Sequence, residues 1–280
     1  MNSGDILIKK QRLDILIYLK GLTESREKAK FLIKEGKVLV NNQLTKKPSI
    51  LCCENSEIIL TGNLKYVSRG GLKLEKAIKK FQINLKNKIA LDVGASTGGF
   101  TDCMLQHGCI KVYAVDVGFG QLHWKLRNDP RVINIERTNI RYINTKLIKD
   151  NINFFTIDVS FISLGIVLDN VTKILNKGVN IYGVCLIKPQ FEASKHDLNN
   201  NGVIKSSALI TKIIKKIIKI CLNYGFSVEN LDFSPITGPN GNIEYLIFLK
   251  QSAIPKVSKN INICEIETNS HKILKKYIKI

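Results

Sequence analysis

The segment Lys88-Ile-Ala-Leu-Asp-Val-Gly-Ala-Ser-Thr-Gly-Gly-Phe-Thr-Asp102 gives the strongest indication of the fold. An apolar run reaches a single acid, Asp92, and small residues then extend from Gly94 to Gly99 before a helical pattern resumes. Small residues let a backbone turn approach a ligand closely, and the N-terminus of a following helix offers free N–H groups. The segment therefore predicts a strand–turn–helix unit that binds a nucleotide-like ligand.

The glycine spacing narrows the class of ligand. It is Gly-x-x-x-Gly-Gly, which matches neither the G-x-G-x-x-G dinucleotide pattern nor a P-loop that ends in Gly-Lys-Ser/Thr. A loop without a phosphate-binding lysine suits S-adenosylmethionine, which contains adenosine but no phosphate. The alternative is a tight turn with no ligand, because isolated glycine-rich motifs often occur by chance.

Strands and helices alternate from Lys88 to about Leu249, which predicts a doubly wound α/β sheet. Four strand candidates each end on one charged residue, and these residues are Asp92, Asp116, Asp158 and Lys188. The carboxyl ends of parallel strands form the ligand crevice of this fold, so we expect the four side chains at one edge of the sheet. The last two strand candidates, 226–233 and 245–249, are joined through a turn and predict a hairpin.

Residues 6–62 predict a separate α+β unit. A helix is expected from Gln11 to Lys20, and Thr23 or Ser25 can cap a second helix that runs to Gly36. Short strands are expected around 38–40 and 57–60. The second helix is strongly basic on one side, which indicates either an RNA-binding surface or an ordinary solvated face.

The remaining segments complete the predicted domain organisation. Residues 63–72 are expected to link the two parts, Lys73 to open an amphipathic helix, and 251–280 to form a basic tail with a short helix after Ser270. The predicted boundaries are therefore 1–62, 63–72, 73–250 and 251–280.

Composition restricts the partners and the compartment. The net charge of +20 predicts a polyanionic partner, either nucleic acid or an anionic membrane. The seven cysteines form no C-x-x-C pair and fall in apolar runs, so we expect reduced core residues and no metal site. No apolar run approaches 18 residues, which predicts a cytoplasmic protein without a membrane span.

Two family resemblances emerge from these motifs. Arg12-Leu-Asp together with the segment from Ser25 to Asn42 resembles an S4 RNA-binding domain. The second part resembles the TlyA family of rRNA 2′-O-methyltransferases, long labelled haemolysins, whose catalytic domain is similar to the FtsJ/RrmJ type. The stretches that match in order are Val67-Ser-Arg-Gly-Gly-Leu-Lys-Leu, Asp92-Val-Gly-Ala-Ser-Thr-Gly-Gly-Phe-Thr-Asp, Tyr113-Ala-Val-Asp-Val-Gly-Phe-Gly-Gln-Leu, Glu136-Arg-Thr-Asn, Asp158-Val-Ser-Phe-Ile-Ser-Leu, Ile187-Lys-Pro-Gln-Phe-Glu and Gly241-Asn-Ile-Glu-Tyr.

The resemblance implies an α/β fold with a doubly wound, Rossmann-like S-adenosylmethionine methyltransferase sheet and a small N-terminal α+β S4 domain. It also implies a catalytic Lys-Asp-Lys-Glu tetrad at Lys73, Asp158, Lys188 and Glu244. A ribose 2′-hydroxyl becomes a good nucleophile only after it loses its proton. Our hypothesis is that Lys188 is the base, Lys73 raises the local positive potential, and the two acids orient the two amines.

The remaining site residues follow from the same patterns. Gly94 to Gly99 should pass beneath the methionine and ribose portions of the cofactor, Asp116 should bind the ribose hydroxyls, and Asn139 is a candidate for adenine or a simple turn residue. The full cofactor-binding prediction is Asp92, Gly94, Ala95, Ser96, Thr97, Gly98, Gly99, Phe100, Asp116, Asn139 and Asp158. Phe119 and Trp124 could stack on a base, but core packing is the preferred interpretation for both. The predicted RNA-binding residues are Arg12, Arg26, Lys28, Lys30, Lys37 and Arg69.

The favoured function is therefore S-adenosylmethionine-dependent 2′-O-methylation of ribosomal RNA, as part of ribosomal subunits, with cytidine implied as the target by the resemblance. One alternative is an S4-type RNA-binding or ribosome-assembly factor whose methyltransferase-like domain is inert. A second alternative is a membrane-active haemolysin, which the absence of a spanning segment disfavours. A nicotinamide oxidoreductase is disfavoured by the glycine spacing.

Overall fold

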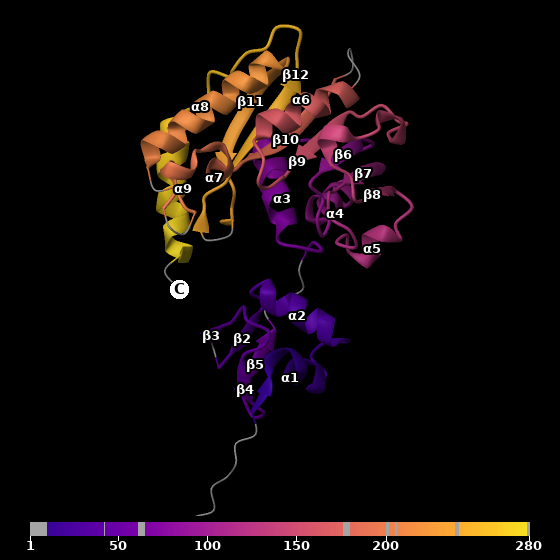
Figure 1. Ribbon diagram of the computed structural model, residues 1–280, viewed down its shortest axis with the longest axis vertical. Coiled ribbons are helices and arrows are strands. Elements are labelled where there is room, and N and C mark those ends of the chain that lie inside the picture. The colour runs from indigo at the N-terminus through magenta and orange to yellow at the C-terminus, as the bar shows by residue number, and fades with distance from the viewer. Residues whose placement is uncertain are drawn as a thin grey trace, which may run out of the picture. The chain divides into compact units, whose positions relative to one another are not determined.

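The computed structural model describes residues 10–41, 43–60, 65–175, 180–199, 202–204, 206–238 and 241–278 (Figure 1). The chain divides into two compact units, Met1–Lys65 and Tyr66–Ile280. The predicted linker 63–72 begins with two residues outside the described part of the chain, and its last three residues already belong to the first helix of the large unit.

The small unit packs two helices on short antiparallel strands. Its core contains Leu13, Ile17 and Ala29, all fully buried. The first helix begins two residues later than expected, because residues 10–12 pair with residues 51–53 as strands. The Ser25 hydroxyl accepts a hydrogen bond from the Lys28 amide at 3.1 Å, which confirms the predicted cap. The elements are β1 (Lys10–Arg12), α1 (Leu13–Leu19), α2 (Arg26–Lys34), β2 (Val38–Val40), β3 (Gln43–Leu44), β4 (Leu51–Cys53) and β5 (Ile58–Leu60).

The large unit is built on a seven-stranded sheet in the order β11-β12-β10-β9-β6-β7-β8. The five strands from β10 to β8 are parallel, whereas β12 is antiparallel to both of its neighbours, as the predicted terminal hairpin requires. The strands are β6 (Ile89–Val93), β7 (Lys111–Val115), β8 (Val132–Ile135), β9 (Phe154–Ile157), β10 (Tyr182–Ile187), β11 (Phe226–Phe233) and β12 (Tyr245–Gln251).

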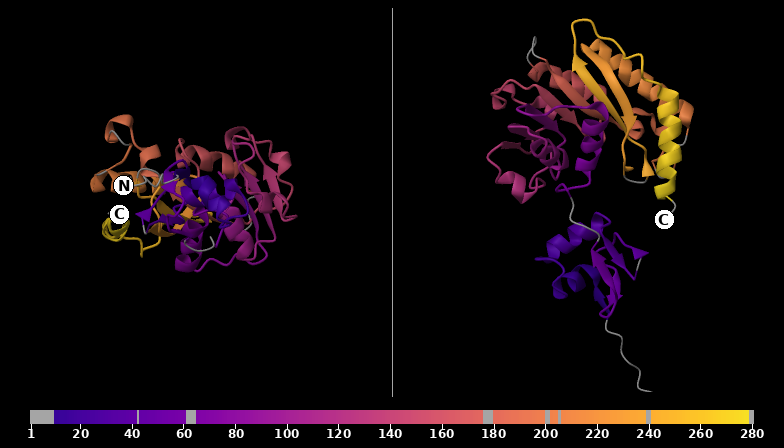
Figure 2. Two further views of the ribbon diagram at one scale, coloured as in Figure 1. Left: turned by 90° about the horizontal axis from the view of Figure 1, so that it is seen from below. Right: turned by 180° about the vertical axis from the view of Figure 1, so that it is seen from behind.

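Helices cover both faces of this sheet, because its strands are apolar on both sides. Ala90 and Leu91 illustrate the alternation: Ala90 belongs to the core cluster that includes residues of α3, α4 and α5, whereas Leu91 belongs to the cluster that includes residues of α6, α8 and α9. The two helical layers can be followed in Figure 1 and, from below and behind, in Figure 2. The helices are α3 (Gly70–Phe81), α4 (Gly99–Gln106), α5 (Trp124–Arg127), α6 (Leu164–Ile174), α7 (Pro189–Glu192), α8 (Ser207–Asn223) and α9 (Ile263–Ile278), with 3₁₀ turns at Ile140–Tyr142, Thr145–Leu147 and Lys195–Asp197.

The register of the parallel strands aligns their carboxyl ends. Val93, Val115 and Ile157 lie side by side in neighbouring strands, so the residues that follow them emerge at one edge of the sheet. Asp116 and Asp158 are at this edge, as predicted, but Asp92 is not. Strand β6 continues through Val93, which places Asp92 inside the sheet.

The predicted C-terminal tail requires a correction. Helix α9 begins at Ile263 rather than after Ser270, and it packs against α8 and β11. Ser270 and Leu274 are buried, because the helix turns one face toward the large unit. Residues 263–278 are therefore part of that unit and not a separate basic tail.

The predictions from the sequence also concern the cysteines, membrane-spanning helices and metal ligands. All seven cysteines are free thiols, and five are buried, but Cys264 is exposed and not a core residue. No helix among the described residues is long and apolar enough to cross a membrane. Within those residues, no group of His, Cys, Asp and Glu side chains could hold a metal ion.

Candidate active site and RNA-binding surface

The structure brings Lys73, Asp158, Lys188 and Glu244 into one cluster. The Lys73 Nζ lies 2.6 Å from Glu244 Oε2 and 3.3 Å from Asp158 Oδ2. The Lys188 Nζ lies 2.7 Å from Asp158 Oδ1. Two amines and two carboxylates thus form a chain of ion pairs in which Asp158 is shared by both lysines.

Four separate elements position these side chains. Lys73 is in the first turns of α3, Asp158 follows β9, Lys188 follows β10, and Glu244 immediately precedes β12. Lys73, Lys188 and Glu244 are only 9%, 8% and 1% exposed. Buried charges are stable only when they are paired, and the two positive and two negative groups balance each other here.

Burial and neighbouring charge oppose each other at Lys73. Burial acts to lower the pKa of the Lys73 amine, but the carboxylates of Asp158 and Glu244 outweigh it and raise that pKa above its ordinary value. Burial likewise acts to raise the pKa of Asp158, but Lys73 and Lys188 outweigh it and lower that pKa. Lys73 is therefore held as a cation and Asp158 as an anion.

Two adjoining cavities meet at this cluster. The larger has a volume of about 510 Å³, and the smaller has a volume of about 210 Å³. Both cavities are lined by Gly94, Ser96, Asp158 and Ser160. Lys188 lines the smaller cavity, whereas Lys73 lines neither. The two lysines therefore differ in their access to a bound molecule.

Most of the predicted cofactor residues line these cavities. The larger cavity has a volume within the range of small-molecule sites, roughly 300–1,000 Å³. The predicted residues that line one or both cavities are Gly94, Ala95, Ser96, Thr97, Gly99, Phe100, Asp116, Asn139 and Asp158. Asp92 and Gly98 line neither cavity.

The glycines of the loop are required by the protein as well as by a ligand. Gly94 has a φ of +84°, and a Cβ atom there would lie 2.5 Å from the carbonyl oxygen of Asp158. A Cβ atom on Gly99 would lie 2.3 Å from the Ser68 hydroxyl and 2.8 Å from the Gly71 amide nitrogen. The small residues therefore let this loop pack directly against the two segments that carry Asp158 and begin α3.

Asp92 supports the loop from within the sheet and is not placed to contact a cofactor. It is fully buried, and its two carboxylate oxygens accept hydrogen bonds from the hydroxyls of Thr101 at 2.6 Å and Thr156 at 2.8 Å. Burial raises the pKa of Asp92 to about 6, although the threonine hydroxyls oppose the shift. The prediction that Asp92 binds the cofactor does not fit this placement.

Asp116 has the geometry expected for a sugar ligand. Its carboxylate accepts backbone N–H groups from Ser96 and Gly118, both at 2.7 Å. A carboxylate has about four acceptor positions, so about two remain for ribose hydroxyls. Asn139 also lines the larger cavity, but its side-chain oxygen already accepts the Arg141 amide at 3.0 Å. The donor and acceptor pattern fits an adenosine in this cavity.

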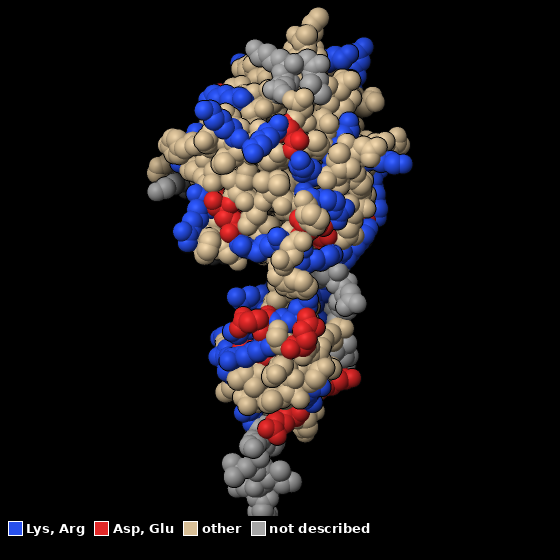
Figure 3. Space-filling view, turned by 90° about the vertical axis from the view of Figure 1, so that its right-hand side faces the viewer, with Lys and Arg blue, Asp and Glu red and all other residues tan. Residues whose placement is uncertain are grey.

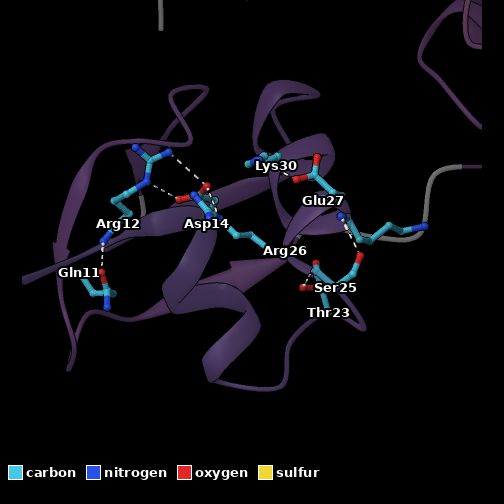
Figure 4. A network of polar contacts seen from close by, with 9 residues as sticks. Gln11, Arg12, Asp14, Thr23, Ser25, Arg26, Glu27 and Lys30 are labelled. Carbon is cyan, nitrogen blue, oxygen red and sulfur yellow. Dashed lines mark hydrogen bonds and ion pairs between the residues drawn. The ribbon is translucent and has the colours of Figure 1, made fainter. Parts of the chain in front are cut away.

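In the small unit, Arg12 and Arg26 are joined through one buried acid (Figure 4). The carboxylate of Asp14, 0% exposed, lies 3.0 Å from the Nε of Arg12 and 3.0 Å from the Nε of Arg26. The arginine side chains remain 39% and 45% exposed. Burial acts to raise the pKa of Asp14, but the two guanidinium groups outweigh it and lower that pKa.

The other predicted RNA-binding residues differ in their acidic neighbours and in their exposure to solvent. Lys28 is 3.9 Å from Glu24, and Lys30 is 2.6 Å from Glu27. Lys37 and Arg69 are half-buried, and Arg69 belongs to the large unit. Figure 3 shows Lys and Arg side chains over both units on the face that it presents, with acidic side chains among them on the small unit. Acidic neighbours therefore offset part of the predicted basic surface.

Comparison with known families agrees with both units. A family model described as FtsJ-like methyltransferase matches residues 66–251, and an S4 domain model matches residues 11–58. The chain belongs to the TlyA group of FtsJ-like methyltransferases.

Relatives of this methyltransferase span nearly its whole length. It is 43% identical to "Putative rRNA methyltransferase YqxC" of Bacillus subtilis over 95% of this chain and 96% of the relative. It is 35% identical to "16S/23S rRNA (cytidine-2'-O)-methyltransferase TlyA" of Mycobacterium tuberculosis over 87% of this chain and 91% of the relative. A solved structure named "Putative hemolysin from Streptococcus thermophilus" covers 98% of this chain and 100% of its own, with 43% identity and a TM-score of 0.78.

The methyltransferase site also contains residues that the sequence interpretation missed. The Ser160 hydroxyl accepts a hydrogen bond from the Lys188 amine at 3.0 Å, and Ser68 lines the smaller cavity. Ser160 and Ser68 each lie in a stretch that carries the family resemblance, and Ser160 also follows Asp158 by two residues, but neither serine was singled out. Phe119 and Trp124 are 65% and 71% exposed, so the preferred interpretation as core residues was wrong.

Proposed function

We propose that this methyltransferase transfers a methyl group from S-adenosylmethionine to the 2′-hydroxyl of a cytidine ribose in ribosomal RNA. The observation that carries the proposal is the position of Lys188, which lines the smaller cavity and whose amine contacts Asp158 and Ser160, two residues that line both cavities. A cofactor in one cavity and a ribose in the other would meet beside this amine. The Bacillus and Mycobacterium relatives, named as rRNA methyltransferases, support the substrate class.

The larger cavity is suited to hold the adenosine part of the cofactor, because Asp116 would accept its ribose hydroxyls. The loop from Gly94 to Gly99 would pass beneath the methionine portion, where Gly94 and Ser96 line both cavities. S-adenosylmethionine, when bound, supplies a methyl group on a positively charged sulfur. The nearby protein charges balance, so no excess of positive charge opposes this group.

Lys73 and Lys188 have different roles in the reaction. A neutral amine can accept the 2′-hydroxyl proton, whereas Lys73 is held as a cation by two carboxylates and lines neither cavity. We assign the base to Lys188 and assign Lys73 to fixing Asp158 and Glu244 in place. Lys188 would take the proton as the O–H bond of the ribose breaks, and the oxygen would bond to the methyl carbon while the bond from that carbon to the cofactor sulfur breaks, with its electron pair staying on the sulfur, which leaves as a neutral thioether.

RNA would be held by both units through its phosphates. Arg12 and Arg26 offer guanidinium groups that bind phosphate in a bidentate way, and Lys37 and Arg69 add positive charge. Phosphate contacts release counterions, so the affinity for RNA should fall steeply with salt. A ribosomal substrate also assigns the enzyme to the cytoplasm.

The test is to map ribose methyl groups on ribosomal RNA by mass spectrometry, in cells with and without the gene. We expect at least one 2′-O-methylcytidine to disappear in the deletion strain and to return with the wild-type chain but not with Lys188→Ala. Unchanged methylation would refute the proposal. Calorimetry then separates an inert RNA-binding factor, which would bind RNA but not S-adenosylmethionine.

A further inference from the structure

We propose that Ser160 is a positioning residue for the base, and that its hydroxyl orients the Lys188 amine toward the smaller cavity. The inference rests on the proposed function, because it concerns the orientation of Lys188 as the acceptor of the ribose proton. Ser160 lines both cavities and follows Asp158 by two residues.

The contacts of the Lys188 amine differ in kind. The amine donates a hydrogen bond to Ser160 Oγ at 3.0 Å, whereas Asp158 holds it through an ion pair. Among the residues that the structure describes, the Ser160 hydroxyl is the hydrogen-bond acceptor for this amine. Asp158 draws the amine in one direction at 2.7 Å, and the directional hydrogen bond to Ser160 adds a second direction, so the two contacts together fix the rotation of the amine.

The hydrogen bond to Ser160 helps to determine where the lone pair of the Lys188 nitrogen points. A neutral amine carries two hydrogens and one lone pair beside its bond to carbon. When Ser160 accepts one hydrogen and Asp158 attracts the other, the lone pair takes the remaining direction. Lys188 lines the smaller cavity, so the remaining direction is available to a ribose hydroxyl there. Without the serine contact, the amine could turn a hydrogen toward the ribose and lose its ability to accept a proton.

The segment around Ser160 contacts the segment that carries Lys188. The next residue, Phe161, has a φ of +65°, a left-handed conformation that is rare for a bulky residue. Its ring packs against the Phe191 ring with a centroid distance of 4.9 Å. Such strain persists only where surrounding contacts enforce it, and it is often found at functional sites.

A second link joins the same two segments. The carboxylate of Glu192 accepts the Ser163 hydroxyl at 2.8 Å and the Leu164 amide at 2.7 Å. Glu192 and Lys188 lie at opposite ends of the short helix α7. The Ser160 loop is therefore joined to this helix by the contact of the exposed Phe161 ring with Phe191 and by the two hydrogen bonds of Glu192.

The test compares the single-turnover rate of methyl transfer in Ser160→Ala, Ser160→Thr and the wild-type chain. The substrate is ribosomal subunits from a strain that lacks the gene, with enzyme and S-adenosylmethionine in excess. We expect Ser160→Ala to lower the rate by roughly 10- to 100-fold, part of the 10²- to 10⁴-fold that a base contributes. The dissociation constants for S-adenosylmethionine and for the subunits should stay unchanged, and Ser160→Thr should restore most of the rate.

Ser207→Ala is the matched control, because Ser207 is exposed at the start of α8. A Ser160→Ala rate within twofold of wild type would overturn the inference. So would a slow Ser160→Thr, or a loss of cofactor affinity equal to the loss of rate. Lys188→Ala, measured in parallel, separates the two proposals: if it is inactive while Ser160→Ala is normal, only the role of Ser160 fails.

Discussion

The two lysines of the tetrad should respond in opposite ways to the same substitution. Replacing Lys73 with Met leaves Glu244 buried without its cation, because among the described residues Lys73 is the only basic partner of Glu244. Replacing Lys188 with Met leaves both carboxylates paired, since Lys73 still contacts Asp158 and Glu244. Lys73→Met should therefore mainly destabilise the protein, and Lys188→Met should mainly abolish activity.

The contacts set the size of each effect. Breaking a buried ion pair by removing one partner costs about 3–5 kcal/mol, so Lys73→Met should lower the free energy of unfolding by this amount. At roughly 2–4 °C per kcal/mol for a unit of this size, its melting temperature should fall by about 6–20 °C. Lys188→Met loses the hydrogen bond between the amine and Ser160 and one of the two ion pairs of Asp158, which together cost about 2 kcal/mol, but its methyl-transfer rate should fall by roughly 10²- to 10⁴-fold.

The assay combines thermal unfolding with the single-turnover rate at a temperature where each variant is folded. Lys173→Met is the control, because Lys173 is an exposed residue that pairs with Asp169 within α6 at 2.8 Å. Such surface pairs contribute at most about 1 kcal/mol, so this variant should behave as wild type. If Lys188→Met kept a rate within tenfold of wild type while folded, the base assignment would be refuted. If Lys73→Met melted as wild type does, the argument from the buried Glu244 would be refuted.

Three further predictions concern other parts of the chain. Asp92→Asn should gain stability relative to wild type as pH rises from 5 through about 6, because the raised pKa of Asp92 stabilises the wild-type fold only while that carboxyl is protonated; the difference between the two melting temperatures, measured from pH 5 to pH 8, should grow by the equivalent of about 1.4 kcal/mol, since about one pH unit of the titration lies above pH 5. Asp14→Asn should destabilise the S4 unit by about 2 kcal/mol and weaken RNA binding in a filter assay, and unchanged RNA affinity would contradict the role of the arginine pair. Gly94→Ala should abolish binding of S-adenosylmethionine in calorimetry because its Cβ would strike the Asp158 carbonyl, whereas Gly225→Ala, with a φ of +83° but no contact closer than 3.9 Å, should bind normally.

The sequence predicts the sheet edge better than it predicts the contacts across that edge. Asp116, Asp158 and Lys188 each follow an apolar run, and strand direction alone brings them to one edge. Asp92 appeared equivalent because its run also ends on an acid, but pairing with β7 and β9 extends its strand by one residue. The boundary of a strand depends on its neighbours, which a local pattern does not contain.

Local sequence patterns could not predict the roles of Lys73 and Glu244, the other two residues of the tetrad. Lys73 and Glu244 are 171 residues apart in sequence, and neither ends a strand of the parallel sheet. Only the family resemblance pointed to them. Ser160 escaped notice for a related reason, since its role depends on a hydrogen bond to a residue 28 positions away. The start of helix α9 was predicted too late, because Ile263 and Ile266 in its first turns pack against the core only once α8 and β11 are in place.

The difference between the two lysines follows from their partners and not from their residue type. Lys73 is held between two carboxylates and carries a raised pKa, so its charge is fixed. Lys188 has one carboxylate, which it shares with Lys73, and one neutral hydroxyl. A hydroxyl accepts a hydrogen bond from the amine without bringing a second carboxylate against it. The serine at 160 thus orients the amine of Lys188 through a neutral group, whereas the amine of Lys73 contacts two carboxylates.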